Sequence, residues 1–279
     1  MDVKGFFKRI FVWAADALFP RDITCDNCGA ELVADTRYTL CAECLEKLPT
    51  IDGHICLVCG APIEDESDYC MRCQNSESNF ERSRSPFVYD GEAKELIHKM
   101  KFGGKKYIAK TLGAFMADCF VKNEMSADVI TFVPMTRQEE RKRGFNQAEL
   151  IANDLGERLH LPVLPALQKI KDTSQQKELT REDRMKNLDG AFRCVFDEVK
   201  RLNVLLVDDV FTTGITANEC AKALLKGKAK SVSVLTAAVT VLKPKGETQE
   251  ADEKEQKKEA KERKNKKEIK IEILDDLDE

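Results

Sequence analysis

The sequence predicts an α/β protein in which a parallel sheet flanked by helices is preceded by a small cysteine-rich module. Two observations predict this architecture. Between residues 87 and 242, apolar runs alternate with segments of helical periodicity, which is the pattern of a parallel sheet with helices on both faces. Before that region, eight of the eleven cysteines form four C-x-x-C pairs, a spacing that suits metal-binding knuckles.

Composition and charge divide the 279-residue chain into five parts. Its 42% hydrophobic residues are enough for a core, and its formal net charge of −4 gives no general attraction to nucleic acid. Any nucleic-acid binding must therefore come from a local patch. The expected parts are an amphipathic N-terminal helix at 1–20, tandem zinc ribbons at 21–74, a polar linker at 75–86, the sheet domain at 87–242, and a charged, disordered tail at 243–279.

The N-terminal segment superficially resembles a signal peptide. Its apolar part is short, is broken by Asp16, and has no small-residue cleavage site before Pro20. No run in the chain approaches the roughly 18 apolar residues of a spanning helix. We therefore expect a cytoplasmic protein whose first helix packs on its own body. A peripheral contact at the inner face of the membrane is the alternative.

The cysteine pairs predict two structural zinc sites. Gly29 and Gly60 each directly follow the second cysteine of a pair, where a knuckle needs an unusual backbone conformation. Disulfides, redox pairs and an iron–sulfur centre are the competing interpretations. The ligands can pair sequentially, as two ribbons, or in a cross-braced pattern. The eight predicted ligands are Cys25, Cys28, Cys41, Cys44, Cys56, Cys59, Cys70 and Cys73.

The sequence of the sheet domain predicts alternating strands and helices. A short strand near Phe87 precedes two helices that are separated by a basic Gly-Gly turn. An apolar run at 128–135 predicts a strand that ends at Pro134. The segment after it has the periodicity of an amphipathic helix. After a polar excursion at 168–193, the remaining elements are a strand at 204–209, a helix from about Thr216 to Leu225, and a strand at 231–241.

Two basic clusters interrupt this pattern. The turn KMKFGGKK gathers four lysines around Phe102, which fits either a solvated turn or a patch that meets single-stranded nucleic acid. The second cluster includes Arg141 and Arg143 at a strand-to-helix junction, where guanidinium groups suit an anionic ligand. Glu139 and Glu140 neutralise part of it, so surface ion pairs are the alternative.

The segment VLLVDDVFTTGIT, residues 204–216, carries the most specific signal. A buried parallel strand leads into Asp208 and Asp209 at the sheet edge where α/β proteins bind ligands. Carboxylates can accept hydrogen bonds from the paired hydroxyls of a ribose. The following turn offers hydroxyls and backbone N–H groups at a helix N-terminus, which favour a phosphate. An ordinary βα turn with a helix cap is the alternative. The complete motif favours a binding site for a phosphorylated ribose.

This order of parts resembles the signature of type I phosphoribosyltransferases, which bind phosphoribosyl pyrophosphate (PRPP) with Mg²⁺. The resemblance implies that Asp208 and Asp209 are the catalytic acids and hold the ribose hydroxyls. It also implies that the loop after them holds the 5′-phosphate. The residues of that loop are Thr212, Thr213, Gly214, Ile215 and Thr216.

From about Phe6 to Val239 the chain is similar to the ComF family, which joins an N-terminal zinc ribbon to a phosphoribosyltransferase-like domain. The matching motifs are LFP, the four cysteine pairs, LIHKMKF, VPM with RKRGFNQAE, TSQQKEL, and VDDVFTTGIT. Lys171 stands where family members often have an arginine. The resemblance implies that Pro134, Arg141 and Arg143 face the pyrophosphate and that residues 171–187 form a mobile loop.

The family resemblance further implies a role in DNA uptake during natural transformation. Its expected partners are PRPP, incoming single-stranded DNA and the DNA-uptake machinery. Two hypotheses follow. In one, the pocket is kept for ligand binding while the protein handles DNA. In the other, the protein is an active phosphoribosyltransferase whose acceptor the sequence does not identify.

Overall fold

The computed structural model describes residues 23–32, 36–74, 76–171 and 188–241. The expected N-terminal helix, most of the expected mobile loop and the expected charged tail lie outside these residues. Within them, no helix combines the length and apolar character needed to span a membrane.

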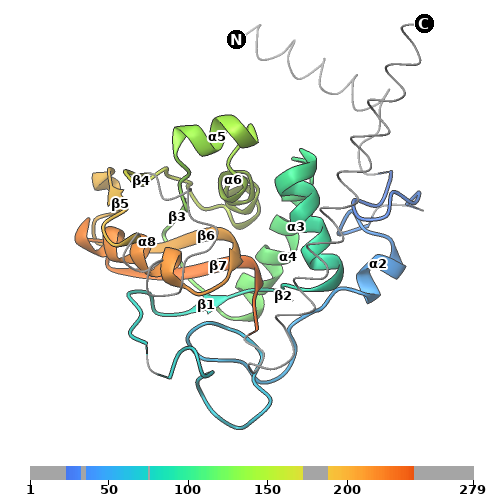
Figure 1. Cartoon of the computed structure of the whole chain (residues 1–279), viewed down its shortest axis with the longest axis horizontal. Coiled ribbons are helices and arrows are strands. Elements are labelled where there is room, and N and C mark those ends of the chain that lie inside the picture. Colours follow the sequence, from blue (N-terminus) through green and yellow to red (C-terminus); the bar gives the residue numbers. More distant parts are fainter. Residues whose placement is uncertain (1–22, 33–35, 75, 172–187, 242–279) are drawn as a thin grey trace, which may run out of the picture. The chain divides into compact units, whose positions relative to one another are not determined.

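The described residues contain one five-stranded parallel sheet (Figure 1). β7 (Ser231–Val239) and β6 (Asn203–Phe211) are its long central strands. Both are apolar along most of their length because helices cover both faces. β3 (Val129–Phe132) pairs with β6 on the side opposite β7. Two short strands, β1 (Ser83–Arg84) and β2 (Phe87–Val88), pair with β7.

The alternation along β6 divides the core into two halves. Leu205 and Val207 face the half built with α3 (Gly91–Gly103), α4 (Ile108–Lys122) and α6 (Gln147–Leu159). Val204 and Leu206 face the half built with α8 (Ile215–Lys226). Successive side chains of a strand point to opposite faces, so the predicted parallel sheet with helices on both sides is confirmed.

Smaller elements surround the sheet. β4 (Leu167–Lys169) and β5 (Phe192–Cys194) form an antiparallel pair on either side of residues 172–187. The short helix α5 (Arg137–Arg143) follows β3 and begins with a capping box between Thr136 and Glu139. A helix, α2 (Ala42–Glu46), lies within the first cysteine set, and a 3₁₀ turn, η1 (Asp197–Val199), precedes β6.

Two element boundaries differ from the sequence expectation. The expected linker at 75–86 ends inside the sheet, because Ser83 and Arg84 pair with Val234 and Leu235 of β7. β6 also continues past the acid pair to Phe211, which pairs with Val239. In both cases hydrogen bonding to β7 extends the strand into residues whose polar character suggested a linker or a turn.

Candidate functional site

The eight paired cysteines form two separate four-thiol sets. Each set collects consecutive pairs, and the sulfur atoms within a set all lie within 4.8 Å of one another. The Sγ–Sγ distances are 3.7 Å for Cys28 and Cys41 and 3.6 Å for Cys59 and Cys70. Tetrahedral zinc with bonds of about 2.3 Å needs sulfurs about 3.8 Å apart. The residues therefore fit two zinc ions, and the pairing is sequential rather than cross-braced.

The two sets repeat one backbone design. Gly29 donates its N–H to the carbonyl of Cys25 at 2.8 Å, and Gly60 donates to Cys56 at 2.9 Å. Both glycines have positive φ angles, 79° and 71°, a conformation that side-chain-bearing residues rarely adopt. These turns bring the two thiols of each first pair together.

The surroundings lower the pKa of one cysteine in each set and raise the pKa of others, among them Cys44 and Cys73. A hydrogen bond from Cys73, with help from the neighbouring Arg72, lowers the pKa of Cys59 to about 4. Burial alone would raise the pKa of Cys25, but backbone hydrogen bonds lower it to about 6. Four thiolates leave zinc no open position for a substrate. Both sites are therefore structural.

The first ribbon is fixed to the helices beside it. Lys99 of α3 donates to the backbone carbonyl of Asn27 at 2.9 Å and to its side-chain oxygen at 2.6 Å. Tyr38 stacks on Phe115 of α4 with ring centroids 3.7 Å apart. Lys99, which the sequence grouped with an exposed basic turn, is thus used to hold the ribbon.

The acid pair lies within β6, with one carboxyl on each side of the sheet. Asp209 has the same parity as Val207 and points toward α3, where Lys101 Nζ lies 2.8 Å from its Oδ1. Asp208 has the parity of Leu206 and faces the α8 side. The backbone N–H of Asp209 donates to Asp208 Oδ1 at 2.8 Å, so the two residues remain in direct contact.

The ionisation of this pair is strongly perturbed. Burial, followed by the charge of Asp209, raises the pKa of Asp208 to about 7. Burial by itself lowers the pKa of Lys101, but Asp209 and Asp208 raise it more, so the net shift is upward. Lys101 is thus a protonated partner for the acid pair. From the sequence alone, Lys101 was only one of four lysines in a basic turn.

The threonine-rich loop joins β6 to α8. Gly214 has a φ of 79°, and a Cβ there would lie 2.8 Å from the ring of Phe211, so the turn requires glycine. Gly214 is also the N-cap of α8 and supplies no side-chain cap. Helix N-termini without such a cap retain backbone N–H groups that can bind an anion. Thr213 Oγ1 accepts the N–H of Ile215 at 3.5 Å.

The turn after β3 is held next to the acid pair. Val133 donates its N–H to the carbonyl of Val207 at 3.0 Å, which places the turn beside the residue before Asp208. Asn146 then fixes the turn from the other side. Its Nδ2 donates to the carbonyl of Val133 at 3.0 Å, and its Oδ1 accepts the N–H of Ala148 at the start of α6.

A basic cavity of about 560 Å³ opens at this turn. It gathers residues from the α3–α4 turn, the β3 turn, α5 and β4. Among the predicted site residues it includes Pro134 and Arg143, but not Arg141, which is exposed. The lining residues are Lys101, Phe102, Gly104, Val133, Pro134, Met135, Glu139, Lys142, Arg143 and Lys169.

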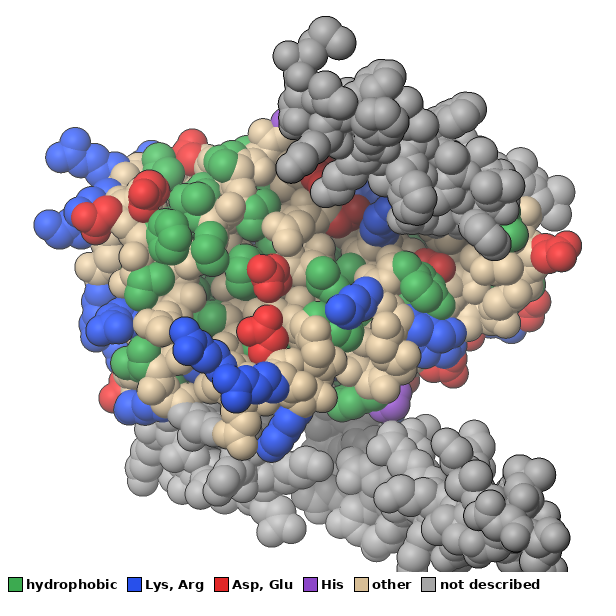
Figure 2. All heavy atoms as spheres, turned by 90° about the horizontal axis from the view of Figure 1, so that it is seen from above, with side chains coloured by type: hydrophobic (Ala, Val, Ile, Leu, Met, Phe, Trp, Pro, Cys, Tyr) green, Lys and Arg blue, Asp and Glu red, His purple; other side chains and the backbone are tan. Residues whose placement is uncertain are grey.

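The two basic clusters that are far apart in sequence meet at this cavity. The Arg143 guanidinium lies 5.5 Å from the ring centre of Phe102, and Lys106 Nζ lies 5.0 Å from that of Phe145. Phe102 remains 63% exposed. Glu139 is not free to neutralise the arginines, because it pairs with Lys169 and caps α5. Figure 2 shows a face on which Lys and Arg side chains lie beside hydrophobic and acidic ones.

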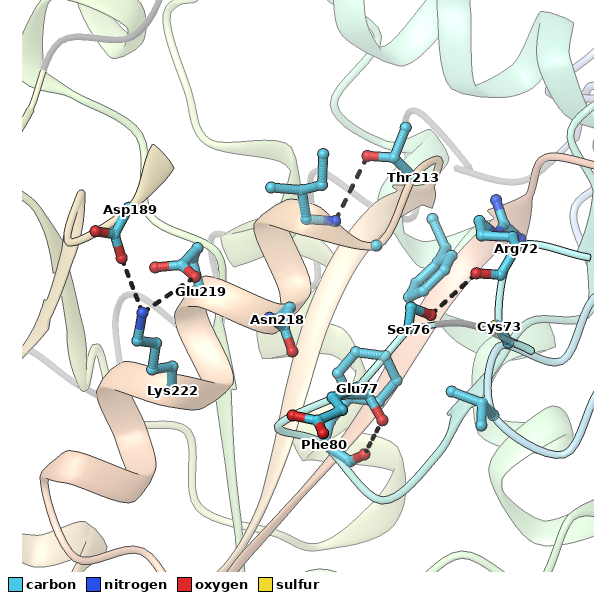
Figure 3. Close-up of a pocket in the computed structure, with 15 residues that line it drawn as sticks. Arg72, Cys73, Ser76, Glu77, Phe80, Asp189, Thr213, Asn218, Glu219 and Lys222 are labelled. Carbon is cyan, nitrogen blue, oxygen red and sulfur yellow. Dashed lines mark hydrogen bonds and ion pairs between the residues drawn. The ribbon is translucent and has the colours of Figure 1, made fainter. Parts of the chain in front are cut away.

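A second cavity, of about 470 Å³, borders the threonine-rich loop from the side of the second ribbon (Figure 3). Thr213, Gly214 and Ile215 line it together with Arg72 and Asn218. The predicted site residues are thus divided between two cavities. Pro134 and Arg143 line one, the loop borders the other, and the acid pair lies on the strand that leads into that loop.

Comparison with known proteins agrees with this architecture. Residues 14–74 match the family model described as a double zinc ribbon domain. Competence protein ComFC of Bacillus subtilis is 29% identical over 244 residues, which cover 83% of this chain and 96% of the relative. DNA utilization protein YhgH of Escherichia coli K12 is 30% identical over 203 residues, covering 71% of this chain and 88% of the relative.

Solved structures give weaker matches. Glutamine PRPP amidotransferase from B. subtilis is 22% identical, with 46% of this chain and 26% of that chain covered and a TM-score of 0.33. A purine phosphoribosyltransferase from Pyrococcus horikoshii is 20% identical, with 48% and 76% covered and a TM-score of 0.28. Scores this low carry no argument about activity.

Together, these features define a class of protein in which a double zinc ribbon is joined to a parallel α/β sheet of the predicted class. The sheet carries an acid pair and a threonine-rich loop at its carboxyl edge. On the strength of its relatives, the chain belongs to the ComF family.

Proposed function

We propose that the protein binds PRPP with Mg²⁺ at the carboxyl edge of its sheet and acts in DNA uptake by handling incoming single-stranded DNA. One observation carries the first half: the acid pair, the start of α8 and the β3 turn all lie at or near the carboxyl ends of two adjacent strands. Its relatives include proteins named for competence and for DNA utilization, which supports the second half.

Each part of PRPP would meet a suitable group. Asp208 and Asp209 would bind the ribose hydroxyls, and the loop from Thr212 to Thr216 would bind the 5′-phosphate through its N–H and hydroxyl groups. Pro134 and Arg143 line the basic cavity, which would receive the pyrophosphate. Mg²⁺ bound with the ligand would neutralise pyrophosphate charge, and the carboxylates of the acid pair would hold it near the ribose.

Lys101 is the group that the ligand would displace from the acid pair. In the free protein it neutralises Asp209 at 2.8 Å, so the carboxylates do not repel each other unopposed. A divalent cation or a pair of hydroxyls would replace this contact. Lys101 also lines the basic cavity, and its ammonium group is within reach of the pyrophosphate side of the site.

The DNA half of the proposal rests on the surface around Phe102. An exposed aromatic ring beside Arg143, followed in the chain by Lys105 and Lys106, offers a base-stacking platform with cationic groups for the backbone. Because the chain is acidic overall, this local patch and not the net charge would attract the strand.

Calorimetric titration with Mg-PRPP tests the pocket. We expect the wild-type chain to bind and the double variant Asp208→Asn/Asp209→Asn to lose at least about tenfold in affinity, which is about 1.4 kcal/mol. Asp197→Asn, an exposed carboxylate in η1 that lines neither cavity, is the control and should bind like wild type. Equal binding by all three proteins would overturn the site assignment.

Fluorescence titration with a labelled oligonucleotide tests the DNA surface. Replacing Phe102 by Ala should weaken binding about 5- to 100-fold, since stacking contributes about 1–3 kcal/mol per base. Replacing Lys105 and Lys106 together should also flatten the dependence of affinity on salt. Tyr69→Ala removes an exposed aromatic from the second ribbon and should change nothing. Loss of affinity in that control alone would place the DNA elsewhere.

Catalysis is the second candidate function. The acid pair and the basic cavity are next to each other, as transfer of a phosphoribosyl group with departure of pyrophosphate requires. Release of pyrophosphate from PRPP over a panel of nitrogenous bases measures it directly. Turnover that disappears in Asp208→Asn/Asp209→Asn would establish an enzyme. Binding without turnover for any base would favour the ligand-binding role.

A further inference from the structure

A single buried arginine connects the second ribbon to the threonine-rich loop. Arg72 lies between the ligands Cys70 and Cys73 and is 5% exposed. Its Nη2 donates to Cys59 Sγ and to the carbonyl of Thr240, each at 3.3 Å. Its Nη1 donates to the carbonyl of Thr212, the first residue of the loop.

The shape of the guanidinium makes this connection stiff. Arginine presents its N–H groups in a fixed planar fork, so the contact to Cys59 and the contact to Thr212 cannot be oriented independently. The group also packs 5.3 Å from the ring centre of Phe211, directly before the loop. A charge this deeply buried is stable only where its partners are in place, so the fork and its acceptors fix one another.

Fixing the Thr212 carbonyl also fixes an N–H group that would face a phosphate. The carbonyl of Thr212 and the N–H of Thr213 belong to one planar trans peptide and point in opposite directions. Arg72 draws the carbonyl toward the ribbon, and Thr240 Oγ1 donates to the same oxygen at 3.2 Å. The Thr213 N–H is therefore directed away from the ribbon, and under the proposed function it is one of the groups that would meet the phosphate of the ligand.

The other buried arginine of this region provides a contrast. Arg84 of β1 is 7% exposed and donates to the carbonyl of Leu57 at 3.1 Å, so it also joins the second ribbon to the sheet. Its described hydrogen bonds stay within the ribbon and β1. Only Arg72, of these two, contacts both a zinc ligand and the loop.

We propose that Arg72 is a positioning residue that couples the second zinc site to the loop 212–216, so that zinc at this site sets the conformation in which the loop binds the phosphate of its ligand. The identity of that ligand rests on the proposed function. Zinc holds Cys59 in place, Cys59 and Thr240 hold the guanidinium, and the guanidinium orients the first peptide of the loop. Hydrogen bonds to a metal ligand commonly orient metal sites in this way.

Coupling between two sites is reciprocal, which gives the test. Zinc-loaded full-length protein is treated with N-ethylmaleimide, and alkylation of each cysteine is followed by peptide mass spectrometry, with and without Mg-PRPP. The ligand should slow alkylation of the second cysteine set several-fold and leave the first set unchanged. In Arg72→Met that ligand-dependent slowing should disappear, while Arg84→Met should retain it.

One further measurement and one substitute variant distinguish failure of the coupling from failure of the proposed function. Hydrogen exchange of peptides covering 208–216, measured without PRPP, should accelerate in Arg72→Met and not in Arg84→Met. If wild type does not bind Mg-PRPP, the proposed function fails, and this exchange result alone decides the coupling. If Arg72→Met does not fold, Arg72→Lys replaces it, because one ammonium cannot bridge both acceptors with a planar fork.

Three results would overturn the proposal. Mg-PRPP could bind and protect both cysteine sets equally or neither set. Arg72→Met, or Arg72→Lys in its place, could retain the full ligand-dependent slowing. Exchange of the loop could be the same in the Arg72 variant as in the Arg84 variant.

Discussion

Asp208 illustrates at the residue scale how a proposed binding group can cost stability. It is held in a half-buried position next to Asp209, and burial raises its pKa to about 7. An aspartate with a raised pKa binds its proton more tightly in the folded state than in the unfolded state. Stability therefore falls as pH rises from about 4, the unfolded pKa, toward 7, and it stays low above that range.

This sign gives a prediction for Asp208→Asn. At pH 8 the variant should be more stable than wild type by at least about 1 kcal/mol, or about 2–4 °C in melting temperature for a body of this size. The difference should be smaller at pH 6, where Asp208 is largely protonated. Scanning calorimetry of the zinc-loaded protein measures both values. A variant less stable than wild type at pH 8 would contradict the assigned environment.

At the scale of elements, α6 and the β3 turn are joined through one side chain. Asn146 caps α6 through its oxygen and holds the carbonyl of Val133 through its nitrogen. The cap is a matter of helix stability, whereas the second contact positions the turn that carries Pro134. In the sequence, Asn146 stands out only as part of the motif RKRGFNQAE. Its two contacts could not be foreseen, because one of them reaches back across the basic helix α5.

Two substitutions separate these contacts. Asn146→Ala removes both and should cost about 1–2 kcal/mol of stability, together with affinity for Mg-PRPP. Asn146→Ser keeps a good cap but loses the amide donor to Val133, so stability should fall less than in Asn146→Ala while affinity falls equally. Chemical denaturation and calorimetric titration measure the two effects. Equal affinity in wild type and Asn146→Ser would show that the turn does not depend on this hydrogen bond.

Local patterns predicted the elements well, and contacts distant in sequence were the part they missed. Each knuckle is closed by a glycine that directly follows the second cysteine of a pair. The spacing of cysteines and glycines in the sequence was therefore enough to predict the knuckles. The acid pair could be located on its strand, but not the contact of Asp209 with Lys101. That ion pair exists because α3 packs on the face to which Asp209 points, and no single segment contains this information. The role of Arg72 was hidden for the same reason.

At the scale of the whole molecule, the ribbons and the sheet form one described body. The first ribbon packs on α3 and α4 through Lys99 and Tyr38, while the second joins the sheet edge where Ser83 donates its N–H to the carbonyl of Val58 at 2.6 Å. A Cβ on Gly60 would lie 2.7 Å from the carbonyl oxygen of Ser83, so this contact is close. The ribbons are therefore part of the structure that carries the site.

Removal of zinc should accordingly destabilise the sheet domain as well as the ribbons. We expect a chelator to lower the melting temperature of the whole described body in a single transition and to weaken Mg-PRPP binding, because metal binding and folding are linked at such sites. Calorimetry before and after chelation, with zinc restored as the control, measures this. A sheet transition that is unchanged after zinc is lost would mean that the ribbons are independent modules.

The central claim is that one phosphorylated ribose ligand binds across the acid pair, the threonine-rich loop and the β3 turn. Hydrogen exchange of the full chain with and without Mg-PRPP tests both the binding and its place. The account predicts slower exchange in peptides covering 133–147 and 208–216, with the cysteine-rich peptides of the first ribbon unchanged. Binding that protects neither of those two segments, or no protection at saturating ligand, would contradict it.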